Sequence, residues 1–520
     1  MAAHLFGWQT KTSFTSVSDT VLACHADRPA ATGCDAGRRP HPAYPVVPSR
    51  HAAEQVRPGQ DRSFRPSPPG PRTSIGDVLD FLDSIPLYGT ATTVVCAVLG
   101  VLSVVVLVLA LPKDRRTRIL VLASGLTVLV SVVALVIVLV VLSVPLSEIP
   151  VGTMVGVVLI LWCLFLGVVD LASHLDRLST SWHRVWLTVP VAVAVVVGLV
   201  AVNASYRIYP DIGSLTPDEP YTKVHADQIP DAAGADGTVA VSDWNPPRTS
   251  RGMPDIGTRF SATIPAPASG FQARPAQIYL PPAWFTVPRP RLPVIVLMPG
   301  IPGSPDQWFD QGQAAEVSQD YQKNHHGLSP IIAVVDATGS TWNNPVCTDS
   351  PRGKVRTYLD QDVPAWLKDR LDADPDRAHW AIGGLSYGGT CALQVGANSP
   401  HGYGTVLDFS GERTPVNDAD DHAATVRDFF GGSEDAFRAA NPEDLFKAHA
   451  ADGRYRHLRV WFVAGHSDQG AIRDLSALAQ VATAAGADVT VRKVPGGHDF
   501  GTWRTALKEA FPTVAEQGGL

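Results

Sequence analysis

The stretch that decides the fold is residues 383–389, Gly-Gly-Leu-Ser-Tyr-Gly-Gly, between an apolar run and a run of small residues. Residues 379–382, His-Trp-Ala-Ile, are typical of a buried strand, and residues 390–395, Thr-Cys-Ala-Leu-Gln-Val, of the start of a helix. Glycine has no Cβ, so glycines on both sides of Ser386 let the backbone pass close to its neighbours. The pattern G-x-S-x-G in a strand-turn-helix setting predicts a sharp, strained turn that exposes the Ser386 hydroxyl.

A serine held in this way becomes a nucleophile when a histidine takes its proton and a carboxylate orients that histidine. In this type of site the acid and the histidine follow the serine in the chain. His498 lies in a loop directly after the alternating, strand-like residues 489–494. Asp468 lies in the loop that leaves the apolar residues 458–463. We therefore predict Ser386 as the nucleophile, His498 as the base and Asp468 as the acid.

Each assignment has a structural alternative that the sequence leaves open. The alternative for Ser386 is an ordinary serine in a tight glycine turn. The alternative for His498 is a surface histidine without a catalytic role. Asp468 is equally suited to capping the helix predicted to begin near residue 471. Asp474 and His466 stay open as alternatives for the chemistry near His498.

Acyl transfer at a serine also requires donors for the oxyanion of the tetrahedral intermediate. One donor is usually the backbone N–H of the residue after the nucleophile, here Tyr387. The second is expected after the apolar strand at residues 294–298, in the sequence Pro299-Gly300-Ile301-Pro302. Because proline has no N–H, we predict Ile301 as the second donor.

The strands of the C-terminal half alternate with helical segments, which is the pattern of a doubly wound, mostly parallel α/β sheet. Residues 259–264 and 271–280 alternate as strands and are expected to form its antiparallel edge. Helices are predicted at residues 360–371 and 472–485. The parallel strands are predicted at residues 294–298, 331–335, 379–382, 405–409 and 458–463.

Three separated motifs resemble the esterase D type of esterases, which includes S-formylglutathione hydrolases and the secreted mycolyltransferases of mycobacteria. The resemblance covers about residues 257–511 and implies an α/β-hydrolase fold with a Ser-His-acid triad. It also implies hydrolysis or transfer of carboxylic esters without a metal or other cofactor. The mycolyltransferases have a glutamate where this chain has Asp468. The motifs are Pro299-Gly300-Ile301, residues 384–389, and Gly497-His498-Asp499 with Trp503 and Arg504.

The N-terminal half contains four apolar stretches that are each long enough to cross a bilayer as a helix. Basic residues in the connections mark the cytoplasmic side. The first and third connections are basic and the second is not, so we expect both ends of the region, and the domain after Asn203, outside the cytoplasm. The stretches are residues 92–111, 119–142, 151–169 and 185–202, and the basic residues are Lys113, Arg115, Arg116 and Arg118, then Arg177 and Arg184.

The spans carry few ionisable residues, and Asp170 lies at the predicted cytoplasmic end of the third. This favours an anchor over a transporter or channel. The expected organisation is a disordered tail at 1–86, four membrane helices at 87–203, a linker or stalk at 204–255 and an esterase domain at 256–520. Alternatively, the true start of the protein is near Ile75. The arrangement is similar to that of actinobacterial membrane esterases.

Composition supports this division. The chain of 520 residues has 45% hydrophobic residues, and its formal net charge of −7 argues against a nucleic-acid partner. The expected partner is an ester or acyl-donor substrate, with lipids included, and the oligomeric state is left open. The leading hypothesis is a membrane-anchored extracytoplasmic serine esterase. An acyltransferase acting on a cell-envelope lipid or glycan, and a hydrolase-like domain that only binds a ligand, are the alternatives.

Two further features bear on the site. Cys347 and Cys391 are expected either to form a disulfide outside the cytoplasm or to stay as free thiols. Residues 338–356 follow a strand on the face where ligands bind in such sheets, and we expect them to shape substrate choice. The cations of this loop, Arg352, Lys354 and Arg356, either contact an anionic substrate or are simply solvated.

Overall fold

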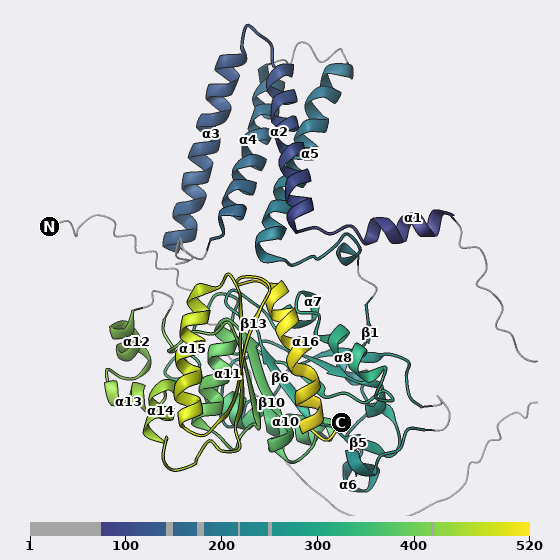
Figure 1. Ribbon diagram of the computed structural model, residues 1–520, viewed down its shortest axis with the longest axis vertical. Coiled ribbons are helices and arrows are strands. Elements are labelled where there is room, and N and C mark those ends of the chain that lie inside the picture. Colours follow the sequence, from purple (N-terminus) through teal and green to yellow (C-terminus); the bar gives the residue numbers. More distant parts are fainter. Residues whose placement is uncertain (1–73, 142–148, 174–180, 217–218, 248–251, 418–420) are drawn as a thin grey trace, which may run out of the picture. The chain divides into compact units, whose positions relative to one another are not determined.

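The computed structural model describes residues 74–141, 149–173, 181–216, 219–247, 252–417 and 421–520 (Figure 1). Most of the tail predicted at 1–86 lies outside the described residues. Its last part differs from the expected disorder, because Ser74–Asp83 form the helix α1.

All four predicted apolar stretches form helices that are long and apolar enough to cross a membrane. Many of their apolar side chains face outward, and Val101, Leu109 and Val121 are each more than 60% exposed. Such a continuous apolar surface suits a lipid environment rather than water. The helices are α2 (Thr90–Ala110), α3 (Arg116–Val136), α4 (Val151–Ser173) and α5 (Ser181–Tyr206).

The C-terminal half is built on a sheet with helices packed around it (Figure 1). The sheet has nine strands in the order β1-β3-β4-β7-β6-β10-β11-β12-β13. Strand β4 runs antiparallel to both of its neighbours, and the remaining neighbouring pairs are parallel. The strands are β1 (Tyr221–Lys223), β3 (Gly257–Ala262), β4 (Ala276–Leu280), β6 (Val294–Met298), β7 (Ile331–Val334), β10 (Ala381–Leu385), β11 (Thr405–Phe409), β12 (Arg459–Gly465) and β13 (Asp488–Val494).

Helices cover both faces of this sheet. Successive side chains of a strand point to opposite faces, and both sets are apolar here, so each face needs a cover. In β6, Val294 and Val296 join one buried cluster, and Ile295 and Leu297 join the other. The first cluster includes apolar residues of α10, α11 and α15, and the second includes those of α8 and α16. These helices are α8 (Ala314–Gln322), α10 (Val363–Leu371), α11 (Tyr387–Asn398), α15 (Gln469–Ala484) and α16 (Phe500–Gln517).

The sheet and its covering helices confirm the predicted α/β-hydrolase class preceded by four apolar helices. The expected linker at 204–255 differs in part, because it supplies β1 at the edge of the sheet and the short strand β2 (Thr238–Ala240). Three-residue strands are too short to show the alternation by which a strand is recognised. The smaller elements are α6 (Gly234–Gly237), β5 (Arg289–Arg291), α7 (Gln307–Asp310), β8 (Asp349–Ser350), β9 (Gly353–Lys354), α9 (Val355–Thr357), α12 (His422–Phe429), α13 (Glu434–Arg438) and α14 (Pro442–Ala448).

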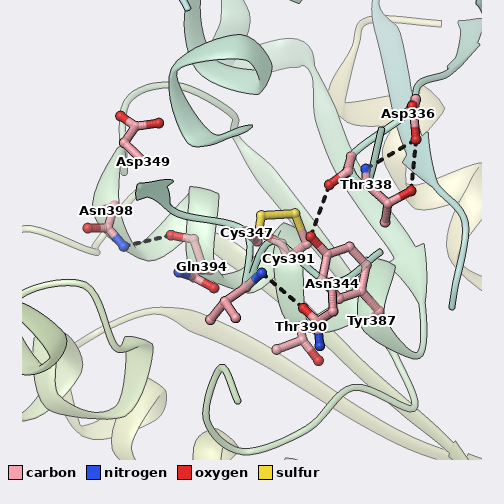
Figure 2. The surroundings of a disulfide bond; sticks show 12 residues. Asp336, Thr338, Asn344, Cys347, Asp349, Tyr387, Thr390, Cys391, Gln394 and Asn398 are labelled. Carbon is pink, nitrogen blue, oxygen red and sulfur yellow. Dashed lines mark hydrogen bonds between the residues drawn. A yellow bond between two sulfur atoms is a disulfide. The ribbon is translucent and has the colours of Figure 1, made fainter. Parts of the chain in front are cut away.

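A disulfide joins Cys347 to Cys391 and ties the loop after β7 to the helix α11 (Figure 2). The two Cα atoms are 5.2 Å apart and the sequence separation is 44 residues. Asn344 fastens the same loop by donating from Nδ2 to the carbonyl of Val416 at 3.1 Å. The sequence left the pairing open, and the structure shows the paired form.

Removing this cross-link should destabilise the domain. Closing a loop of this length restricts the unfolded chain and typically stabilises a protein by about 2–4 kcal/mol. We expect the double variant Cys347→Ala/Cys391→Ala to melt at a lower temperature than the oxidised wild type in thermal unfolding followed by circular dichroism.

Reductant is the matched control for this variant. Dithiothreitol should lower the melting temperature of the wild type toward that of the double variant and should leave the double variant unchanged. Equal melting temperatures for oxidised wild type and double variant would contradict the stabilising role of the disulfide.

Candidate active site

Ser386 stands at the junction of β10 and α11, so the predicted strand-turn-helix is confirmed. Its backbone has φ 54° and ψ −122°, a conformation that a residue with a side chain rarely adopts. The N–H of Ser386 donates to the carbonyl of Phe409 at 2.8 Å, and its carbonyl accepts from Gly389 at 2.9 Å. These bonds hold the strained turn in place.

The glycine at 388 is required by a close approach of two chain segments. A Cβ at Gly388 would lie 2.4 Å from the carbonyl oxygen of Met298, at the end of β6. No side chain fits in that space, so the start of α11 can lie against the end of β6 only with glycine at this position.

The three predicted residues come together in one hydrogen-bonded chain. The Ser386 Oγ lies 2.9 Å from His498 Nε2, and His498 Nδ1 lies 2.8 Å from Asp468 Oδ2. Because a carboxylate only accepts, Nδ1 carries the proton and Nε2 is free to accept from the serine. His498 is half-exposed, whereas the side chain of Asp468 is 10% exposed. A base oriented in this way beside a serine hydroxyl has the geometry for nucleophilic catalysis.

The two oxygens of Asp468 serve two different partners. Oδ2 accepts from His498, and Oδ1 accepts from the backbone N–H of Ala471 at 3.2 Å, which caps α15. Asp468 therefore caps α15 and also contacts His498, as the predicted acid would, so the two alternatives do not exclude each other. The alternative Asp474 lies within α15, where its charge acts on Arg413.

The charge of Asp468 is maintained by its surroundings. Burial raises the pKa of this carboxyl, but the hydrogen bonds from His498 and from the N–H of Ala471 lower it by more. The net pKa lies below its usual value, so Asp468 is ionised at neutral pH. An ionised carboxylate is what stabilises an imidazolium.

The loop that carries His498 is braced by residues to which sequence reasoning gave no role. Asp499 Oδ2 accepts from the N–H of Gly497 at 2.7 Å, and Oδ1 accepts from the N–H of Thr502 at 3.0 Å. The ring of Trp503 meets that of His498 edge to face, with centroids 5.2 Å apart. Asp499 thus starts α16 and shapes the turn on which the imidazole sits.

The loop after β6 passes directly over Ser386. A Cβ at Gly300 would lie 3.4 Å from the Cβ of Ser386 and 2.8 Å from the side chain of Leu385. Ile301 follows in this loop, and Tyr387 follows Ser386 in the chain. Gly300, which precedes Ile301, therefore lies against Ser386, which precedes Tyr387. The donor role of Ile301 and Tyr387 stays a prediction.

Asp408 is a second carboxyl near the turn, and sequence reasoning missed it. It is fully buried on β11, and its Oδ1 accepts from the N–H of Gly411 at 2.9 Å. Burial, with a contribution from the charge of Glu412, raises the pKa of Asp408 to about 8. The hydrogen bond from the N–H of Gly411 opposes this shift. Within residues 405–409, a single aspartate in an apolar strand gives no sign of this environment.

The sequence left open whether the cations of the loop at 338–356 contact a substrate or are solvated, and in the structure two of them contact other parts of the domain. Arg352 lies over the ring of Phe429, 4.6 Å from its centroid, and Arg356 donates to Asn398 Oδ1 at 2.8 Å. Both arginines therefore hold the loop to neighbouring parts of the domain. The residues that this structure describes contain no group of three or more His, Cys, Asp or Glu side chains arranged to hold a metal.

A mostly parallel sheet with a strained serine turn and an aligned Ser-His-Asp chain defines the site of an α/β-hydrolase. Residues 271–514 match the family model described as "Putative esterase". An uncharacterized protein of Corynebacterium glutamicum is 39% identical over 363 residues, which cover 68% of this chain and 81% of the relative. The chain belongs to this esterase family, and the resemblance seen in its motifs is confirmed.

Two solved esterase structures are similar to this chain. A ferulic acid esterase is 21% identical, with a TM-score of 0.41 over 48% of this chain and 99% of its own. An S-formylglutathione hydrolase from Agrobacterium tumefaciens is 16% identical, with a TM-score of 0.41 over 52% of this chain and 98% of its own.

Exchanging the acid should separate orientation of the base from folding. In Asp468→Asn the side chain still caps α15, since asparagine is as good a cap as aspartate. Its amide favours the wrong tautomer of His498, so kcat should fall by roughly 10²- to 10⁴-fold. KM should change little, because the carboxylate acts on the transition state. Steady-state hydrolysis of a p-nitrophenyl ester measures both constants.

The matched control is Asp474→Asn, which changes a carboxylate six residues further along the chain, within α15. We expect its kcat to stay close to that of the wild type. A near-normal Asp468→Asn enzyme beside an inactive Asp474→Asn enzyme would assign the acid to Asp474.

Proposed function

We propose that this protein is a membrane-anchored serine esterase that hydrolyses carboxylic esters through an acyl-enzyme on Ser386. The observation that carries the proposal is the aligned chain from Ser386 Oγ through His498 to Asp468, with contacts of 2.9 and 2.8 Å. Membership of an esterase family supports the same reaction class.

In the proposed reaction, His498 Nε2 takes the proton of Ser386 as Oγ attacks the carbonyl carbon of the ester. The N–H groups of Tyr387 and Ile301 receive the negative charge that develops on the carbonyl oxygen. Asp468 stabilises the imidazolium, which then gives its proton to the departing alcohol. A water molecule, deprotonated by His498, attacks the acyl-enzyme. The imidazolium then returns the proton to Ser386 Oγ as the bond to the acyl group breaks and the acid leaves.

Transfer of the acyl group to a lipid or glycan of the cell envelope is the second candidate. It uses the same acyl-enzyme, and a hydroxyl of the acceptor replaces water. The half-exposed ring of His498 is compatible with this candidate, because either an acceptor hydroxyl or water can approach the base from solvent. A hydrolase-like domain that only binds a ligand has no need of an aligned base and acid, so the geometry supports catalysis.

Removing the nucleophile should abolish activity. We expect Ser386→Ala to lose about 10⁴-fold or more in kcat, since Ser386 supplies the hydroxyl that contacts His498 Nε2. The variant should also lose labelling by a fluorophosphonate probe, which reacts covalently with an activated serine. Labelling of Ser386→Ala at the wild-type level would refute the assignment of the nucleophile.

We further propose that the catalytic domain lies outside the cytoplasm. The basic first and third connections support this orientation. The disulfide between Cys347 and Cys391 supports it independently, because disulfides persist in oxidising compartments and are rare in the cytosol.

Protease accessibility tests this orientation. Protease added to intact cells or right-side-out spheroplasts should digest the domain after Asn203, because that domain is exposed outside the membrane. A cytoplasmic protein followed in parallel should stay intact until lysis. If the domain is protected until the cells are lysed, the orientation is the reverse and the substrate is cytoplasmic.

A further inference from the structure

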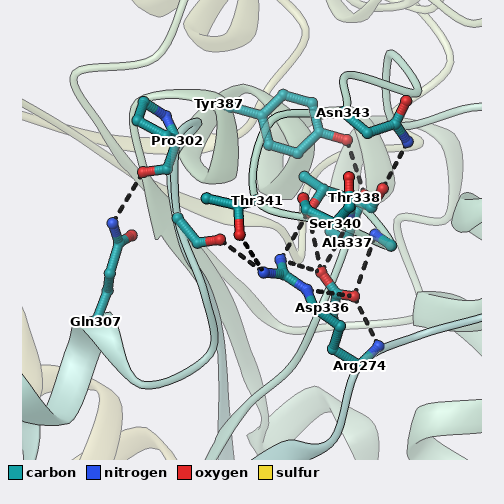
Figure 3. A network of polar contacts seen from close by, with 12 residues as sticks. Arg274, Pro302, Gln307, Asp336, Ala337, Thr338, Ser340, Thr341, Asn343 and Tyr387 are labelled. Carbon is teal, nitrogen blue, oxygen red and sulfur yellow. Dashed lines mark hydrogen bonds and ion pairs between the residues drawn. The ribbon is translucent and has the colours of Figure 1, made fainter.

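A buried ion pair lies beside the loop after β6. Arg274 binds Asp336 through two parallel hydrogen bonds, with Nε 3.1 Å from Oδ2 and Nη2 2.8 Å from Oδ1 (Figure 3). The backbone N–H of Arg274 adds a third bond, to Oδ2 at 2.7 Å. The side chain of Asp336 is 0% exposed and that of Arg274 is 23% exposed. A two-pronged pair of this kind is strong and fixes the plane of the guanidinium.

The remaining arm of Arg274 reaches the loop predicted to carry an oxyanion donor. Nη1 donates to the carbonyl oxygen of Gly303 at 2.8 Å (Figure 3). Gly303 in turn donates its N–H to the carbonyl of Thr341 at 3.1 Å. Gly303 is two residues after Ile301, so the guanidinium holds the far end of the loop that crosses Ser386.

The same network reaches the other predicted donor. The hydroxyl of Tyr387 donates to the carbonyl of Ala337 at 3.0 Å, and Ala337 follows Asp336 directly (Figure 3). Asp336 also accepts from the N–H of Gly339 at 3.1 Å, and Arg274 Nη2 donates to Thr338 Oγ1 at 2.9 Å. The turn after β7 is thereby fixed against both the loop after β6 and the first residue of α11.

We propose that Arg274 is a positioning residue that, paired with Asp336, sets the oxyanion hole of this enzyme. This inference rests on the proposed esterase function. Arg274 acts through the carbonyl of Gly303 and does not itself touch the reacting atoms. Its effect falls on the transition state, because the N–H of Ile301 must lie at the position the oxyanion will occupy.

The chemistry of the position requires arginine. The planar guanidinium donates to Asp336 with Nε and Nη2 while Nη1 points to Gly303. Lysine retains the positive charge beside the buried carboxylate, but its single ammonium group cannot reproduce this fork. Arg274→Lys therefore keeps Asp336 paired and loosens the loop.

The test compares Arg274→Lys with the wild type, as full-length protein in detergent. For hydrolysis of p-nitrophenyl butyrate we expect kcat to fall by about 10- to 100-fold, less than or similar to the loss of a whole oxyanion donor. KM should stay within about twofold. The inhibition constant of a trifluoromethyl ketone should rise in parallel with the fall in kcat, since its tetrahedral adduct places an oxyanion in the hole.

The matched control is Arg289→Lys. Arg289 forms a similarly buried pair, 2.5 Å from Asp372, and it precedes the amino end of β6, opposite the end that carries the site. We expect this variant to change the melting temperature without changing kcat or inhibitor binding. If both lysine variants lose kcat equally, Arg274 is structural only and the proposal is overturned.

Two further outcomes are informative. Unchanged kcat and inhibitor affinity in a folded Arg274→Lys enzyme would also overturn the proposal, while fluorophosphonate labelling of Ser386 would leave the esterase function standing. If Arg274→Lys does not fold, Asp336→Asn takes its place, because it preserves shape and weakens the hold on Arg274. The same selective loss of kcat and inhibitor affinity is then expected. A wild type without hydrolysis or labelling would overturn both the function and this inference.

Discussion

The structure depends on the strained turn at Ser386. A non-glycine residue with a positive φ costs of order 1–3 kcal/mol and persists only when its surroundings determine it. Here the surroundings are the ends of three neighbouring strands. The N–H of Ser386 is bound by the last residue of β11, Phe409, and Gly388 lies under the last carbonyl of β6, at Met298. These contacts form only with this strand order and register, so the strained conformation of Ser386 depends on the sheet.

Parallel strands bring the other parts of the site to the same edge. Loops after β6, β12 and β13 carry Ile301, Asp468 and His498, and each loop follows the carboxyl end of its strand. This is where ligands bind in open α/β sheets. The carboxyl groups at this edge are then distinguished by their surroundings. Burial raises the pKa of Asp408, whereas His498 and the N–H of Ala471 outweigh the burial of Asp468 and lower its pKa.

Local patterns in the sequence predicted much of this arrangement. Residues 294–298 and 405–409 were predicted as strands with the bounds that the structure shows, because short apolar runs between turns are typical of buried strands. The glycines around Ser386 predicted the turn. The chain order of serine, acid and histidine selected Asp468 and His498, which the structure brings into contact. The catalytic roles of these residues stay predictions.

Contacts between distant residues could not be predicted in this way. Arg274 and Asp336 are 62 residues apart, and nothing near either one indicates the other. The same contact explains why the strand predicted at 271–280 begins only at Ala276 in the structure. The N–H of Arg274 donates to Asp336 instead of to a neighbouring strand, and Pro275 has no N–H to donate.

Asp468 shows how the fold and the proposed chemistry depend on one side chain. Its short carboxylate accepts from Ala471, three residues on, as an N-cap does, and this bond fixes the direction of the second oxygen toward His498. The N-terminus of α15 also carries the positive end of the helix dipole, which favours an ionised carboxylate. The start of the helix thus orients the acid and keeps it charged. His498, the proposed base, is therefore held in place by the same side chain whose contact with Ala471 begins α15.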